Sequence, residues 1–155
     1  MKQAAPIYVL GTGLSHDGSA CLLKDGVICV AIEKERITRR KHDGGNDTAA
    51  IRYCLDAEGI TLKDVSLIVQ NANFGMFKEG NGFWEGKPRI IEAGVPIVTI
   101  SHHLAHAYSA IGTSPFREAA ILVIDGCGSS LDDCLDAPPN VSTENPSGHP
   151  AAALF

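Results

Sequence analysis

Residues Ser19 to Ile32 read SACLLKDGVICVAI and carry the clearest structural signal in the chain. Two apolar segments, Ser19 to Lys24 and Val27 to Ile32, are separated by the dipeptide Asp25-Gly26. An Asp-Gly pair between two apolar runs is the strongest short-range signal for a β-hairpin, because both residues tolerate the positive φ of a tight turn. The sequence therefore predicts an antiparallel hairpin near the N-terminus.

Around this hairpin, further apolar runs alternate with helical segments. One helix is predicted from Asp47 or Thr48 to a C-cap at Gly59, and another from the N-cap Ser101 through about Ile111. Apolar runs without helical spacing predict strands over residues 7–11, 65–69, 95–100 and 119–124, the last of them buried. An antiparallel start followed by alternating helices and strands predicts an α/β domain with a mixed sheet.

Composition bounds the class of protein. The 155 residues are 45% hydrophobic and 20% charged, with a net charge of −5. This mild acidity argues against a nucleic-acid partner, which would need a basic patch. The longest aliphatic run, residues 119–124, is too short to cross a bilayer, and no export signal is visible. Five cysteines without a C-x-x-C pair indicate free thiols, so a reducing cytoplasm is expected.

The last part of the chain differs in composition. From Ser129 onward the sequence is rich in Ser, Asp, Asn, Pro and Gly, and no Lys or Arg follows Arg117. Such a segment buries too little apolar surface to offset its ordering entropy. We expect an ordered domain over residues 1–128 and a disordered tail over residues 129–155.

Three of the six histidines fall within the stretch ISHHLAHA, residues 100–107. His102 and His106 are four residues apart, so on a helix both imidazoles project from one face and can share a divalent metal. Asp125 follows the next predicted strand and is the candidate third ligand. Two histidines and one carboxylate leave coordination positions open, as in a working iron or zinc centre. The alternative is a pair of ordinary surface or packed histidines. His103 could join the site, point to solvent or make an outer-shell bond.

Three other segments have both a functional and a structural interpretation. In Ser15-His16-Asp17-Gly18-Ser19, a histidine in a glycine-containing turn could move a proton beside an anion, or the segment is simply a polar turn. The cationic run from Arg36 to Lys41 could bring a lysine to a phosphate, or it is a solvated face. Asp125-Gly126-Cys127-Gly128 suits approach to a phosphate or metal, although such sequences are common in turns.

Taken together, three stretches resemble the N-terminal part of the carbamoyltransferase family, which includes the O-carbamoylating enzymes of antibiotic and nodulation-factor synthesis. They are LGTGLSHDGSACLLKDGVICVAIEKERITRRKHDGG, AIRYCLDAEGITLKDV and SHHLAHAYSAIGTSPFREAAILVIDGCG. The resemblance runs from about Ile7 to Gly128. It implies the first half of an actin-like, sugar-kinase-like ATPase domain with a ribonuclease-H-like sheet.

The resemblance also implies roles for individual residues. His102, His106 and Asp125 match the ligands of an iron-like metal that lies against the phosphate of carbamoyl adenylate. His16 matches a histidine near the acceptor hydroxyl, and is the candidate general base. Lys41 matches a lysine that contacts the activated carbamoyl group or its nucleotide, and Gly126 and Gly128 match the loop at this intermediate. The co-substrates expected are ATP and carbamoyl phosphate, and the acceptor is a hydroxylated small molecule.

Family members are several times longer and continue with a second half-domain and a separate domain that makes carbamoyl adenylate. We therefore expect this chain to be a fragment of an O-carbamoyltransferase that needs a companion chain for activity. One alternative is a catalytically incompetent remnant that binds only a metal or a partner. Another is an ATPase of the same fold without carbamoyl chemistry, against which the histidine pair argues.

Overall fold

The Asp25-Gly26 turn joins β2 (Ser19–Lys24) to β3 (Val27–Glu33) in the computed structural model, which confirms the predicted hairpin. Asp25 and Gly26 have φ values of 52° and 82°, the left-handed conformation that a two-residue hairpin turn requires. Asp25 also caps the neighbouring strand, because its Oδ1 accepts a hydrogen bond of 2.9 Å from the backbone N–H of Ile7. The hairpin is therefore held both by its turn and by the segment that precedes the strand β1 (Tyr8–Leu14).

The structure describes residues 5–14, 17–44, 46–72, 90, 94–125 and 153–154. It contains two compact units, which are described separately: unit 1 comprises residues 1–70 and 80–99, and unit 2 comprises residues 71–79 and 100–155. The predicted loop over residues 71–88 and most of the predicted tail lie outside the described residues. The described part contains no helix that is long and apolar enough to span a membrane.

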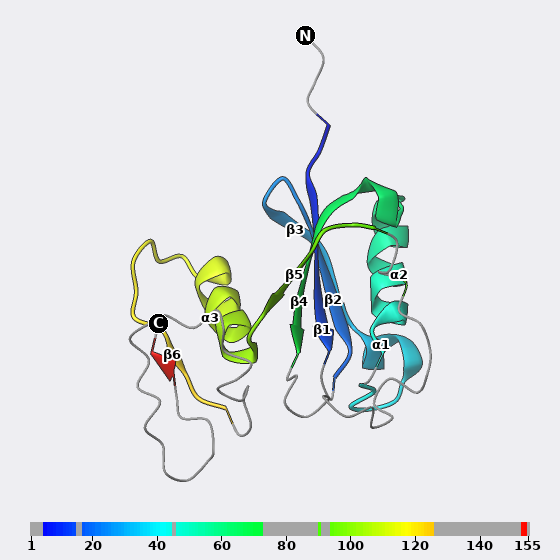
Figure 1. The fold of residues 1–155 in the computed structure, drawn as a ribbon. Helices are drawn as coiled ribbons and strands as arrows, with labels where there is room; N and C mark the ends of the chain where they lie inside the picture. The colour runs from blue at the N-terminus through cyan, green and yellow to red at the C-terminus, as the bar shows by residue number, and fades with distance from the viewer. Residues whose placement is uncertain are drawn as a thin grey trace. The chain divides into compact units, whose positions relative to one another are not determined.

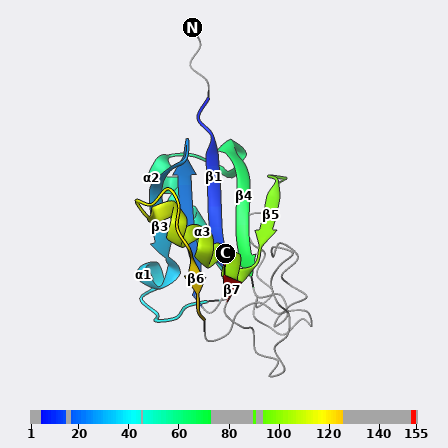
Figure 2. The same cartoon turned by 90° about the vertical axis from the view of Figure 1, so that its left-hand side faces the viewer.

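A five-stranded sheet with the order β3-β2-β1-β4-β5 forms the framework of unit 1 (Figures 1 and 2). Its other strands are β1 (Tyr8–Leu14), β4 (Val65–Ala72) and β5 (Ile97–Ile100). β2 is antiparallel to both β1 and β3, whereas the β1 and β4 arrows point the same way in Figure 1. This mixed sheet confirms the predicted fold class, and its order is that of the ribonuclease-H-like sheet implied by the resemblance.

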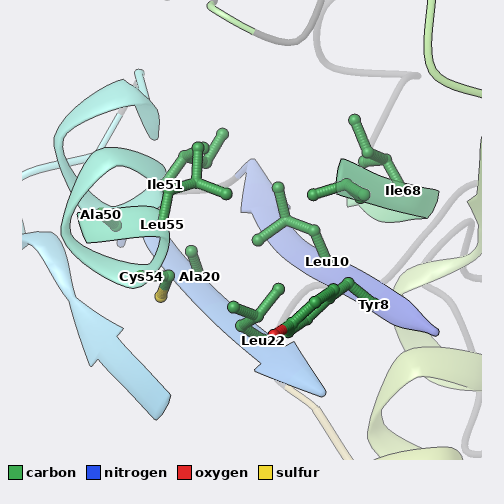
Figure 3. Packing of buried hydrophobic residues seen from close by; sticks show 10 residues of the cluster. Tyr8, Leu10, Ala20, Leu22, Ala50, Ile51, Cys54, Leu55 and Ile68 are labelled. Atoms are coloured by element: carbon green, nitrogen blue, oxygen red, sulfur yellow. The ribbon is translucent and has the colours of Figure 1, made fainter. Parts of the chain in front are cut away.

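The helix α2 (Thr48–Glu58) covers one face of this sheet, and the core of unit 1 lies between them (Figure 3). Its buried residues recur on one stripe of the helix, as the sequence predicted: Ala50, Ile51, Cys54 and Leu55. They pack against alternating residues of the strands, among them Leu10, Ala20, Leu22 and Ile68. The helix ends at Gly59, whose φ of 65° is the left-handed C-cap conformation expected there.

Unit 1 has two further short helical elements. The short helix α1 (Lys34–Thr38) begins directly after β3, inside the charged stretch for which the sequence predicted no element. The 3-10 helix η1 (Leu62–Asp64) precedes β4 and is closed by a capping box between Thr61 and Asp64.

Unit 2 contains α3 (His102–Thr113) and the antiparallel pair β6 (Leu122–Val123) and β7 (Ala153–Leu154). The predicted helix from His102 is confirmed. The prediction of a buried strand over residues 119–124 is wrong: only Leu122 and Val123 form a strand, and of the six residues only Val123 is buried. A buried strand needs cover on both faces, whereas within the described residues β6 pairs only with the two-residue strand β7 and otherwise contacts α3.

Candidate metal centre

The histidine cluster lies at the start of α3, where the local sequence fixes the helix. Ser101 is the N-cap, with the extended conformation typical of that position, and its Oγ accepts a hydrogen bond of 3.3 Å from the backbone N–H of Leu104. His102 is thus the first helical residue, and His106 follows one turn later. Their imidazole rings lie on the same face, with ring centres 4.6 Å apart and planes nearly perpendicular.

Asp125 brings a carboxylate to these two rings. The Nε2 atoms of His102 and His106 are 3.1 Å apart, and Asp125 Oδ2 lies 2.5 Å from the first and 3.3 Å from the second. The His102 side chain is 16% exposed and the Asp125 side chain 28% exposed, although Asp125 as a whole residue is exposed, and the His106 side chain is half exposed. Three residues separated by up to 23 positions therefore place their donor atoms within 4.8 Å of one another.

These distances fit the donor set of a small divalent cation. Bonds of 2.0–2.1 Å in tetrahedral geometry place donor atoms about 3.3 Å apart. The distances from His106 Nε2 to the other two donors are within a few tenths of this value, whereas His102 and Asp125 are closer because a hydrogen bond joins them directly. To bind a cation together, His102 and Asp125 would have to move only slightly apart. Two imidazoles and a carboxylate are the donors that iron(II) and zinc accept with positions left open.

Asn71 lies beside the same cluster. Its side-chain Nδ2 is 3.5 Å from Nδ1 of His102, the ring nitrogen that faces away from Asp125. Metal-binding histidines usually hydrogen-bond through their second nitrogen, and this bond fixes the ring orientation. Asn71 is not among the residues predicted from the sequence, although its position near the end of β4, where α/β sites often gather, could have indicated it.

His103 does not join the cluster. It is 5% exposed, and burial, together with the neighbouring His102, lowers the pKa of its imidazole. The sequence allowed His103 to join the site, to point to solvent or to make an outer-shell bond. The structure excludes exposure to solvent, and His103 is not among the donor atoms that lie close together.

The other predicted site residues belong to different parts of the chain. Lys41 lies in unit 1, exposed in the turn that follows α1. His16, Gly126 and Gly128 lie outside the described residues, so their predicted roles stay predictions. The residues directly after His16 are described, and Asp17 Oδ1 lies 3.0 Å from Nδ1 of His42.

Together, the sheet and the cluster define an α/β protein with a histidine–carboxylate set that can hold a metal ion. Residues 9–80 match the family model described as carbamoyltransferase N-terminus. This match agrees with the resemblance of the three quoted stretches to the N-terminal part of that family.

Two curated relatives cover most of this chain. It is 34% identical over 157 residues to the uncharacterized protein sll1178 of Synechocystis, an alignment that covers 78% of this chain and 26% of the relative. It is 31% identical over 141 residues to the nodulation protein NolNO of Sinorhizobium fredii, covering 77% of this chain and 21% of that protein. The chain thus spans about a quarter of the length of these relatives.

Among solved structures, one similar chain is an uncharacterized Pseudomonas aeruginosa protein with similarity to the peptidase YeaZ. The sequence identity is 16% and the TM-score is 0.40, with 96% of this chain and 66% of that chain covered.

Proposed function

We propose that this chain is the N-terminal part of an O-carbamoyltransferase that moves a carbamoyl group from carbamoyl adenylate to a substrate hydroxyl. The family assignment supports the class of reaction. The observation that carries the metal-assisted form of the proposal is the convergence of His102, His106 and Asp125 on one point. The intermediate would be made from carbamoyl phosphate and ATP by parts of the protein that this chain does not include.

The bonds and electrons of the proposed transfer balance as follows. The acceptor oxygen attacks the carbamoyl carbon, the bond from that carbon to the phosphate oxygen breaks, and AMP leaves with the bonding electrons. The hydroxyl proton must be removed, and His16 is the proposed general base because an imidazole titrates near neutral pH. Lys41, which is exposed, offers a cation to the anionic end of the intermediate.

The proposed metal ligands act on the leaving group. A divalent ion bound by His102, His106 and Asp125 would offset charge on the phosphate. The two imidazoles must be neutral to bind it, and Asp125 contributes the negative charge. Asn71, at the other nitrogen of His102, would hold that ring in orientation.

The first test is metal binding by the purified chain. We expect one equivalent of Fe²⁺, under anaerobic conditions, or of Zn²⁺ in the wild type. His102→Ala and His106→Ala should weaken binding by more than the roughly 10- to 100-fold that loss of an outer-shell partner causes. Ser109→Ala, an exposed residue of the same helix, is the matched control and should bind as the wild type does. Equal binding by all four proteins would contradict the proposal.

The second test is turnover. The chain would be incubated with carbamoyl phosphate, ATP and a hydroxylated acceptor, with and without a second chain that supplies the remaining length of a relative such as NolNO. Carbamoylated acceptor is expected only when both chains are present. Absence of product under every pairing would refute the activity.

Alternatively, the chain is a remnant that binds metal without turnover. This alternative is favoured by the fact that the chain spans only about a quarter of the length of its relatives. Metal that is retained by the wild type and lost in His102→Ala, with no product in any pairing, would support this alternative.

A further inference from the structure

Three short segments of unit 1 that are distant in sequence are joined around Gly18. Its N–H donates a hydrogen bond of 3.2 Å to the backbone oxygen of Asp43, and its own oxygen accepts one of 2.7 Å from the N–H of Lys34. A Cβ at this position would lie 3.1 Å from Lys34 Cδ and 3.3 Å from the Asp43 oxygen, closer than ordinary contacts. The turn after β1, the start of α1 and the loop after α1 therefore meet where only a glycine fits without displacement.

Lys34 forms a second connection between the same segments. Its ammonium group lies 2.8 Å from Asp43 Oδ1 and donates a hydrogen bond of 3.0 Å to the backbone oxygen of Gly44. Both side chains of this ion pair are mostly buried, with exposed fractions of 15% and 19%. The hydrogen bond from Lys34 is the main reason why the pKa of Asp43 lies below its usual value. A partly buried, hydrogen-bonded pair of this kind fixes its surroundings more firmly than an exposed one.

His42, which is exposed, makes two further contacts with the same segments. His42 Nδ1 lies 3.0 Å from Asp17 Oδ1, and the backbone N–H of His42 donates a hydrogen bond of 3.2 Å to Glu35 Oε2. His42 has a φ of 54°, which is unusual for a residue other than glycine, so the contacts hold it in a conformation that it would rarely adopt alone.

These contacts lie on both sides of Lys41. Before it, the N–H of Arg39 donates to the Glu35 oxygen at 2.9 Å; after it, the residues from His42 to Gly44 are fixed as described. Lys41 itself is exposed and has no hydrogen-bond or ion-pair partner among the described residues. Its neighbours are therefore held while its ammonium group stays available to an anion.

We propose that this junction, which we call the Gly18 latch (Asp17, Gly18, Lys34, Glu35, His42 and Asp43), positions Lys41. Lys34 and Asp43 are then positioning residues rather than catalytic ones. The purpose of the positioned lysine, contact with an activated carbamoyl donor, rests on the function proposed above. The latch itself does not depend on that function.

The test combines amide hydrogen exchange with ¹⁵N relaxation of the whole chain. In Lys34→Met, protection of the Gly18 N–H should fall about tenfold or more, because a hydrogen bond to a charged group is lost. The heteronuclear NOE of the Lys41 amide should fall with it, while protection at Leu10 and Leu22 in the core stays unchanged. Lys34→Arg keeps the cation and should restore most of the protection. Lys63→Met, at an exposed lysine of η1, is the matched control.

Unchanged exchange at Gly18, or an unchanged NOE at Lys41, in Lys34→Met would overturn the proposal. A metal could also hold these segments, because one donor atom from each of Asp17, Glu35 and His42 lies within 4.8 Å of the others. If EDTA opens the wild-type junction as Lys34→Met does, a bound cation replaces the latch as the explanation.

The activity readout separates this proposal from the proposed function. In a two-chain assembly that transfers carbamoyl groups, Lys34→Met should raise KM for the carbamoyl donor more than it lowers kcat, and Lys34→Arg should restore KM. An unchanged KM with an opened latch would overturn the positioning role. Absence of transfer in the wild type would refute the proposed function, while the relaxation result at Lys41 would still decide whether the latch positions this residue.

Discussion

At the scale of single residues, the cysteines of unit 1 differ because of where the fold places them. Cys54 is fully buried between α2 and the sheet, and burial raises the pKa of its thiol to about 11. Cys29 is exposed on the edge strand β3. The thiolate is the reactive form, so both its population and its access to reagent are low at Cys54.

Iodoacetamide at pH 7.5 should therefore label Cys29 in the native protein well before Cys54, as peptide mass spectrometry can measure. In urea both thiols should react at similar rates, which provides the control. Equal native rates would mean that α2 does not cover Cys54 as described.

A second prediction at the scale of single residues concerns the stability of the protein at low pH. The pKa of Asp43 is held below its usual value of about 4, chiefly by the hydrogen bond from Lys34 and then by one from Thr38. The ionised form is stabilised in the folded state, so its contribution is complete above the unfolded pKa and is lost as pH falls through the lower, folded value.

The difference in unfolding free energy between wild type and Asp43→Asn should thus be constant from pH 7 to about 5 and should shrink progressively below about 4. Urea unfolding at several pH values measures it. A difference that grows on acidification would contradict the ion pair with Lys34. Asp56→Asn, at an exposed carboxylate of α2, is the matched control.

At the scale of elements, α3 depends on its N-cap. The Ser101 side chain accepts the Leu104 N–H, one of the amides at the start of the helix that have no partner within it. Replacing such a cap with alanine typically costs about 1 kcal/mol. Because His102 is the next residue, fraying here would also displace one of the proposed metal ligands.

Ser101→Ala should therefore lower the free energy of unfolding by about 1 kcal/mol, measured by urea titration, and should weaken metal binding as well. Ser101→Asp should retain most of the stability, since aspartate also caps helices. If Ser101→Ala proves as stable as the wild type, α3 does not depend on this bond.

Elements also differ in how well local sequence predicts them. The hairpin, α2 and α3 have their turn and cap residues within a few positions, and the structure confirms all three. The predicted strand over residues 119–124 had an apolar sequence but no local signal for its partners, and burial of a strand depends on them. The sequence predicted no element in the charged stretch that contains α1, because its five residues include no apolar stripe.

At the scale of the whole molecule, the stability of unit 1 rests on one layer of contacts between α2 and the sheet. Leu10 and Leu22 are fully buried in this layer, together with Ile51 and Ile68 (Figure 3). Removal of a buried leucine side chain to Cβ costs about 2–5 kcal/mol, against a total stability of about 5–15 kcal/mol for a typical domain.

Leu10→Ala should accordingly destabilise the protein by about 2–5 kcal/mol in urea unfolding followed by circular dichroism. Ile28→Ala, on the edge strand and half exposed, is the control and should cost much less. Equal losses for the two variants would mean that the core does not lie between α2 and β1.

Features that depend on neighbouring residues could be predicted from the amino-acid sequence. The Asp25-Gly26 turn, the caps at Ser101 and Gly59, and the pairing of His102 with His106 along one helix face all follow from spacings of a few residues. The carboxylate of Asp125 could be added because a strand end is a common place for site residues.

Contacts between distant segments could be identified only in the folded structure. The contacts of Gly18 with Lys34 and Asp43, and of Asn71 with His102, join residues 16 to 31 positions apart, and no local pattern predicts which residues meet. Such contacts depend on where the folded chain places the ends of its strands. Their partners are therefore set by strand order and loop paths, which a short window of sequence does not encode.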